Sequence, residues 1–222
     1  MRLIDTHSHL FLEEFSEDFP QVIERARAAG VTHIFMPNID STTIEAMLSA
    51  CSVYKGYCFP MIGLHPTSVN ANYEKELEIV ARELKFSKEY VAIGEIGMDL
   101  YWDKTYLKEQ QIVLDKQVNW ALEYDLPIVI HCRDAFDYIY KVLEPYKKTP
   151  LRGIFHSFTG TAEEATRVLE FSDFFIGING VVTFKKSHLP EILAGIPLEK
   201  IVLETDSPYL TPVPNRGKRN ES

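Results

Sequence analysis

Two histidines near the start of the chain are spaced so that both can bind one metal ion. His7 and His9 lie in DTHSHL, directly after an apolar run that predicts a β-strand. Side chains of a strand alternate between its faces, so residues two apart point to the same side. Neutral imidazole is a common metal ligand. The pair is consistent with a cation site, but also with two ordinary core or surface histidines.

Four further residues of ligand type end or interrupt apolar runs elsewhere in the chain. Glu95 lies within AIGEIGMD, while the runs IVIH, GIFH and IVLETD end at His131, His156 and Asp206. An unpaired carboxylate buried in such a run is costly or is forced to stay neutral, and a bound cation would remove that cost. The repetition of one pattern on four runs favours a metal centre over isolated hydrogen-bonding groups.

Four histidines and two carboxylates are too many for one tetrahedral site and suit two divalent cations bridged by a carboxylate. We expect Glu95 to be the bridge, because its two oxygens can each face one ion. One ion would then be held by His7, His9, Asp206 and Glu95, and the other by Glu95, His131 and His156. Nitrogen and oxygen ligands without thiolate suit Mg²⁺, Mn²⁺ or Zn²⁺. Such a centre generates hydroxide from water, and Asp206 is the expected proton acceptor.

The elements that must position these residues alternate regularly along the chain. Amphipathic stretches at 16–30, 42–54, 73–87 and 106–125 predict helices, with Ser41 expected to cap the second and Gly30 to end the first. Eight short runs predict strands that are buried on both faces: 2–8, 32–38, 57–65, 90–99, 126–132, 152–158, 173–182 and 200–207.

Eight strand–helix steps predict an α/β fold of the (β/α)₈ TIM-barrel type, with residues 1–222 as a single hydrolase domain. An open, doubly wound sheet is the alternative, because periodicity does not show closure. The candidate ligands, together with His65, Asp5, Asp99 and Glu204, all fall near the carboxyl ends of predicted strands. In barrel enzymes the active site is built at that end. We expect Asp5, Asp99 and Glu204 to be structural groups or partners that orient histidines.

The final segment, LTPVPNRGKRNES at 210–222, does not predict a helix. A barrel of this kind normally covers its last and first strands with an eighth helix, so the chain is expected to be a shortened natural form or a truncated product. The apolar surface left there would either favour a partner that covers the final strand or lower the stability of the protein.

Charge and composition limit the classes of function. The 222 residues carry a net charge of −9, which argues against broad coating of nucleic acid, so a phosphate substrate must be gripped locally. Three cysteines are too few for a disulfide framework, and we expect them to be reduced. No signal peptide or spanning apolar run is evident, so we expect a cytoplasmic monomer without membrane contact.

Seven blocks give the chain a resemblance to the TatD-type metal-dependent deoxyribonucleases, in the amidohydrolase-like superfamily. They occur in the family's order over almost the whole chain: IDTHSHL, IGLHP, IGEIGMD, IVIHCRDA, FHSFTG, LETDSPYL and PNRGKRN. The resemblance implies a barrel with Glu95 as the bridging glutamate. It also implies a 3′-to-5′ exonuclease, usually supported by Mg²⁺, that acts on single-stranded DNA or 3′ ends and sometimes on RNA, with DNA repair as one expected context.

Carried over position by position, the resemblance repeats the six metal positions and adds residues around them. His65 is a candidate for substrate binding or acid–base catalysis, and Arg133 is suited to a phosphate. Arg216, with Lys218 and Arg219, is expected to hold phosphates or to lie in a solvated tail. Aromatic side chains near the mouth can stack on a base or simply pack at the rim: Tyr101, Trp102, Phe136 and Phe158.

Two other functions are compatible with the same residues. Metal-activated hydroxide attacks carbonyl carbon as well as phosphorus, so an amide, aminoacyl ester or lactone hydrolase is the alternative enzyme. The absence of a predicted last helix motivates an inactive binding or scaffold barrel, although a complete ligand set speaks against it. Activity on a labelled single strand, compared with lactones and amides, separates the first two.

Overall fold

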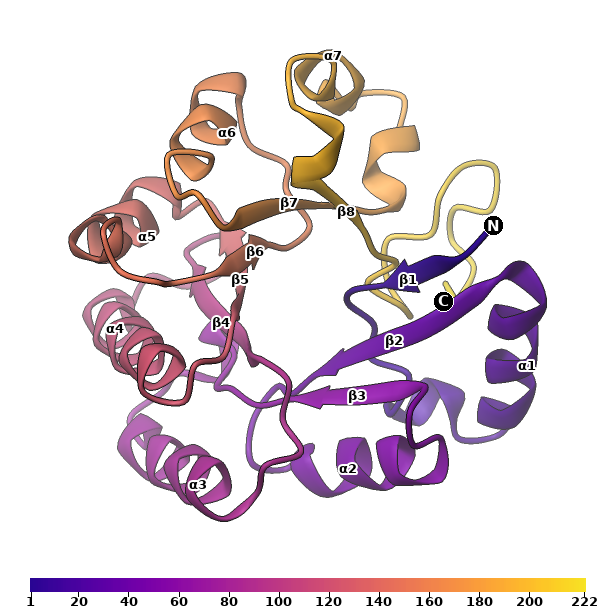
Figure 1. Cartoon of the computed structure of the whole chain (residues 1–222), viewed down its shortest axis with the longest axis horizontal. Coiled ribbons are helices and arrows are strands. Elements are labelled where there is room, and N and C mark those ends of the chain that lie inside the picture. Colours follow the sequence, from indigo (N-terminus) through magenta and orange to yellow (C-terminus); the bar gives the residue numbers. More distant parts are fainter.

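The computed structural model describes residues 1–222 and shows eight parallel strands arranged in a ring, with helices outside it (Figure 1). The strands are β1 (Leu3–Asp5), β2 (Val31–Pro37), β3 (Cys58–Met61), β4 (Ile93–Asp99), β5 (Ile128–Arg133), β6 (Gly153–Phe155), β7 (Phe174–Ile178) and β8 (Ile201–Leu203). All eight predicted strands are present, but most are shorter than predicted. In β1, β6 and β8 the hydrogen-bonded ladder stops before the polar residues that follow the apolar run, whereas β4 and β5 include theirs.

Two short bridges close the ring. The strands pair in two groups, β1–β2–β3 and β4–β5–β6–β7–β8. Ile62 pairs with Ile93 between β3 and β4, and Ser8 pairs with Ser207 beyond the ends of β1 and β8. The second junction is reinforced by backbone hydrogen bonds from His9 N to Ser207 O and from Asp206 N to His7 O, of 2.8 and 2.9 Å. The expected barrel is therefore confirmed, and the open sheet is wrong.

Seven helices surround the strands: α1 (Phe19–Ala29), α2 (Ile44–Val53), α3 (Tyr73–Phe86), α4 (Leu107–Glu123), α5 (Phe136–Leu143), α6 (Ala162–Val168) and α7 (Leu189–Leu193). Gly30 ends α1 as expected, in a left-handed conformation with φ of 95°. Ser41 does not cap α2, which begins at Ile44. Its hydroxyl donates instead to Glu76 of α3, so it ties the turn before α2 to α3.

The core is formed by the strands and the inner faces of the helices. Every residue of β4 is buried, including Glu95 at 2% exposure, as expected for a parallel strand covered on both faces. Cys51, Cys58 and Cys132 are all unpaired. No helix is long and apolar enough to cross a membrane.

The outer side of β8 and β1 is the least covered part of the ring. Residues 210–222 contain no helix, and Leu203 and Ile4 are 56% and 46% exposed. The tail instead returns beside β1 (Figure 1). There Arg219 donates to Asp18, and Asn220 donates to backbone carbonyls of the loop after β8.

Candidate metal centre

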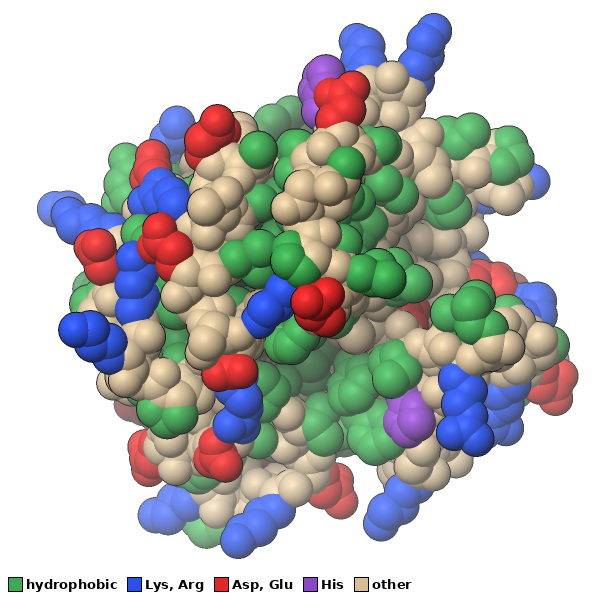
Figure 2. All heavy atoms as spheres, turned by 45° about the horizontal axis from the view of Figure 1, so that its top comes forward, with side chains coloured by type: hydrophobic (Ala, Val, Ile, Leu, Met, Phe, Trp, Pro, Cys, Tyr) green, Lys and Arg blue, Asp and Glu red, His purple; other side chains and the backbone are tan.

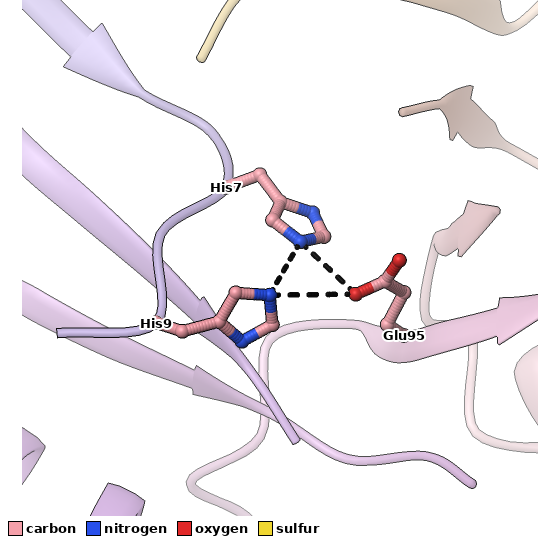
Figure 3. Close-up of side chains that lie close together, drawn as sticks. All are labelled: His7, His9 and Glu95. Atoms are coloured by element: carbon pink, nitrogen blue, oxygen red, sulfur yellow. Dashed lines mark hydrogen bonds and ion pairs between the residues drawn. The ribbon is translucent and has the colours of Figure 1, made fainter. Parts of the chain in front are cut away.

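His7, His9 and Glu95 converge on one point at the mouth of the barrel (Figure 3). The two Nε2 atoms are 3.2 Å apart, and Glu95 Oε2 lies 3.1 Å from that of His7 and 3.6 Å from that of His9. Both histidines lie beyond the end of β1 rather than in the strand. They still face the same way, because the bridge at Ser8 keeps this stretch extended.

The other oxygen of Glu95 faces a second group of imidazoles. Glu95 Oε1 lies 3.0 Å from His131 Nδ1, 3.3 Å from His65 Nε2 and 3.6 Å from His156 Nε2. The carboxylate therefore has five histidine nitrogens around it, divided between its two oxygens. This is the arrangement that a bridging ligand requires.

Asp206 approaches the same space from the loop after β8. Its Oδ1 lies 3.6 Å from His9 Nε2 and 3.8 Å from His7 Nε2, while Oδ2 lies 3.9 Å from His156 Nε2. His156 stacks on His7 with ring centroids 3.4 Å apart. His156 is thus closer to His7 and Asp206 than the predicted division between two ions suggested.

The spacing of these atoms fits divalent cations. Ligands about 2.0–2.1 Å from one ion are roughly 2.8–3.4 Å from one another in octahedral or tetrahedral geometry. The nitrogen–oxygen distances within the clusters, 3.0–3.9 Å, are close to that range. Three sets of side chains have ligand atoms within 4.8 Å of one another: His7–His9–Glu95, His7–His156–Asp206 and His65–Glu95–His131.

Charge is distributed in the cluster so that the carboxylates stay ionised. Burial acts to raise the pKa of Glu95, but the neighbouring imidazoles of His65, His7 and His156 hold it well below its usual range. Burial and the charge of His156 lower the pKa of His7. For His131 burial acts downward, yet hydrogen bonds to Asp99 and Glu95 raise its pKa to about 9.

Two carboxylates stand behind the imidazoles on the side away from Glu95. Asp99 Oδ2 lies 3.0 Å from His131 Nε2, and Gln110 in turn accepts the backbone N–H of Asp99. Glu204 Oε1 lies 3.0 Å from His156 Nδ1, although this pair is not aligned for a hydrogen bond. Burial acts to lower the pKa of His156, but Glu204, Glu95 and Asp206 raise it to about 10.

Asp5 is a structural group, one of the two roles expected for it, and its carboxylate hydrogen-bonds to no imidazole nitrogen. Its carboxylate accepts from the backbone N–H of His7 and from the N–H and hydroxyl of Thr205, at 3.3, 2.9 and 2.6 Å. It therefore ties the loop carrying His7 and His9 to the loop carrying Asp206. Burial raises its pKa to about 6, against the effect of those hydrogen bonds.

His65 was predicted to act on substrate. The structure also places its Nε2 close enough to Glu95 Oε1 for both atoms to bind one cation. The sequence carried a signal for this, since IGLH ends an apolar run just as IVIH and GIFH do. Its Nδ1 accepts a hydrogen bond of 3.2 Å from the N–H of Thr67. In the neutral ring this leaves the hydrogen on Nε2, which points toward Glu95 Oε1.

A cavity of about 650 Å³ opens above the cluster and is lined by both His65 and Arg133. Arg216 does not line it, because its guanidinium stacks over Phe184 at 3.7 Å. Arg219 is held by Asp18 and Glu221 in the tail. Of the basic residues predicted to hold phosphates, the structure brings only Arg133 to the cluster.

Acidic and basic side chains are interspersed on the face shown in Figure 2, without a continuous basic surface.

Comparison with known proteins gives a consistent match over nearly the whole chain. The family model described as TatD related DNase matches residues 4–222. An uncharacterized metal-dependent hydrolase of Bacillus subtilis, YabD, is 39% identical over 220 residues, covering 99% of this chain and 85% of its own. The 3′-5′ ssDNA/RNA exonuclease TatD of Pantoea ananatis is 32% identical, covering 99% and 86%. The crystal structure of YjjV, a TatD homologue of Escherichia coli, superposes with a TM-score of 0.92 at 31% identity, covering 99% and 85%.

Proposed function

This chain belongs to the family of TatD-related DNases, which includes metal-dependent hydrolases, and we propose that it is a 3′-to-5′ exonuclease acting on single-stranded DNA or RNA. The observation that carries the proposal is the position of Glu95, whose two oxygens each face a separate group of histidines within 3.6 Å. A relative that is 32% identical over 99% of the chain bears the name of this activity, which supports the choice of substrate.

The residues present fit two divalent cations, with Mg²⁺ the first choice and Mn²⁺ or Zn²⁺ the alternatives. The proposed ligands are His7, His9, Glu95, His131, His156 and Asp206, within a single hydrolase domain of residues 1–222. When bound there, divalent cations lower the pKa of water toward neutrality and so make hydroxide available at pH 7.

Three side chains complete the proposed mechanism. Asp206 accepts the proton from the attacking water, since its carboxylate lies within the cluster and is kept ionised by His156, His9 and His7 against the effect of burial. His65 lines the cavity, and in place of its contact with Glu95 Oε1 its Nε2 hydrogen would be donated to the oxygen of the leaving nucleotide. Arg133 lines the same cavity and binds a phosphate oxygen, because guanidinium matches phosphate geometry.

Replacement of Glu95 tests the proposal. The wild type, Glu95→Ala and the exposed control Glu199→Gln are compared on a 3′-labelled single-stranded oligonucleotide with Mg²⁺, beside a panel of lactones and amides. We expect stepwise loss of 3′ nucleotides by the wild type and the control. Glu95→Ala should lose nearly all turnover and at least one equivalent of bound metal.

Three results would count against the proposal. Retained turnover in Glu95→Ala would remove the bridging role. Hydrolysis of lactones or amides without cleavage of the oligonucleotide would favour the alternative enzyme. No bound metal, with no rise in melting temperature on addition of Mn²⁺, would favour a scaffold protein.

A further inference from the structure

The aromatic side chains at the mouth of the barrel fall into two groups. Phe136 and Phe158 are 7% and 5% exposed, and both belong to the main hydrophobic core, as rim packing predicts. Tyr101 and Trp102 follow β4 and are 51% and 77% exposed. Packing therefore explains the two phenylalanines but leaves Trp102, the largest of these aromatic side chains, mostly exposed to water.

Trp102 is exposed at a particular place rather than on a remote surface. It lines the cavity of about 650 Å³ that also contains Glu95, His131 and Asp206. Its ring packs edge-on against Tyr101, with centroids 4.7 Å apart. A flat apolar surface is thus held beside the metal centre with its contact area free.

Arg133 fixes this pair and adds charge to it. Its guanidinium lies 3.9 Å from the ring centroid of Tyr101 and 5.5 Å from that of Trp102. It is the only lysine or arginine lining the cavity, and no carboxylate lies within 4.0 Å of it. A guanidinium held by aromatic stacking, with its N–H groups unpaired, is preorganised for an anion.

We propose that Trp102, Tyr101 and Arg133 form a subsite for one nucleotide of a single strand, in which Trp102 stacks on the base and Arg133 binds the adjoining phosphate. The inference rests on the proposed nuclease function and specifies its substrate. Stacking tolerates any base, and it contributes about 10- to 100-fold per base in single-strand binding. Bases paired inside a duplex do not offer a free face, so the subsite selects single strands or frayed 3′ ends.

The chain offers a direct measurement of this contact, because it contains only two tryptophans, Trp102 and Trp120. In a Trp120→Phe background the fluorescence of Trp102 is titrated with a phosphorothioate oligothymidylate that resists cleavage, in the presence of Mg²⁺. We expect saturable quenching that is lost when the three 3′-terminal bases are replaced by abasic residues. Equal quenching by the normal and abasic strands, or none by either, would overturn the subsite.

The rate of cleavage provides a second, independent measurement. We expect Trp102→Ala to lower kcat/KM about 10- to 100-fold on the normal single strand, mainly through KM, but to change it little on the strand with abasic 3′ residues. Phe86→Ala is the matched control, since Phe86 is also 77% exposed but does not line the cavity. An equal loss on both strands, or the same loss in Phe86→Ala, would contradict stacking.

The two measurements distinguish a failure of the subsite from a failure of the proposed exonuclease activity. Quenching that depends on the bases, in a protein that cleaves no strand, would leave the subsite standing and remove the proposed exonuclease. Cleavage by the wild type that is unchanged in Trp102→Ala would remove the subsite and leave the exonuclease standing.

Discussion

Asn220 holds the loop that carries Asp206, although it lies 14 residues later in a tail without regular structure. Its side-chain amide donates to the carbonyls of Thr205 and Tyr209 at 2.9 and 2.8 Å, and its backbone N–H donates to Pro208 O at 2.9 Å. The residue is 7% exposed, while Asp206 has a left-handed backbone with φ of 57°. Asn220 contacts both ends of this loop, whereas Asp5 holds it only at Thr205, so we expect Asn220 to help position Asp206.

Replacing Asn220 with alanine removes two hydrogen bonds and leaves two carbonyls without a donor. Thr205 and Tyr209 are partly accessible to water, which can replace the lost donor. The loss of stability for each bond is therefore about 0.5–1.5 kcal/mol, less than the cost of leaving a buried carbonyl without a partner. The sum of about 1–3 kcal/mol corresponds to a fall in melting temperature of roughly 3–10 °C for a domain of this size. Displacement of Asp206 should weaken metal binding by about 10- to 100-fold.

Asn220→Asp is a more demanding test than Asn220→Ala. Its carboxylate cannot donate a hydrogen bond and would face the carbonyl oxygens of Thr205 and Tyr209. We expect the order of stability to be wild type, then Asn220→Ala, then Asn220→Asp, measured by calorimetry with chelator and again with Mn²⁺. The exposed Asn215 in the same tail is the control, and its replacement by alanine should change the melting temperature little. If Asn220→Asp is as stable as Asn220→Ala, or if both bind metal as the wild type does, the positioning argument fails.

Three shorter predictions concern the groups around the proposed metal site. Glu204→Gln removes the charge that does most to raise the pKa of His156. We expect weaker binding of metal with little change in fold, measured by titration calorimetry. Because the pKa values of His131 and His156 are raised to about 9 and 10, both are protonated at pH 7 in the metal-free protein. Metal binding should therefore release close to two protons and strengthen as pH rises; heats that are identical in buffers of different ionisation enthalpy would contradict this. Gly97→Ala should destabilise the protein far more than Gly56→Ala in denaturant unfolding: both have positive φ, but only at Gly97 would a Cβ collide with the carbonyl of His131.

The part of the centre that could be predicted from sequence is the part that strand periodicity controls. Glu95, His131 and His156 each follow a buried run, so barrel geometry carries them to one end of the ring. His7 and His9 were correctly paired for a related reason, even though β1 ends at Asp5, because the chain stays extended as far as the bridge at Ser8. The predicted end of β4 was correct and that of β5 was one residue early, and both strands include their ligands. The predicted ends of β1, β6 and β8 were too late, because there the polar residues follow the last ladder residue.

The contacts that could not be predicted are those between segments far apart in sequence with no periodic pattern of their own. Asn220 and Arg219 lie in a stretch rich in proline, glycine and charge, which predicts only the absence of a helix. Their partners, Thr205 and Asp18, are brought near by closure of the ring rather than by local structure. The same applies to Trp102. The sequence predicts that it follows a strand, but the exposure of its ring depends on neighbouring loops and could not be predicted.

The electrostatics of the centre imply that protons and cations compete for the same positions. Four carboxylates lie in or directly behind the cluster: Glu95, Asp99, Glu204 and Asp206. Buried negative charge of this density needs compensation. In the metal-free chain the imidazolium forms of His131 and His156 provide it, which is why their pKa values are raised although burial acts in the opposite direction. Loss of metal should consequently cost the fold less than it costs activity. A phosphate, in turn, should bind a protein of net charge −9 much more weakly without divalent cations, because Arg133 is the only lysine or arginine at the cavity.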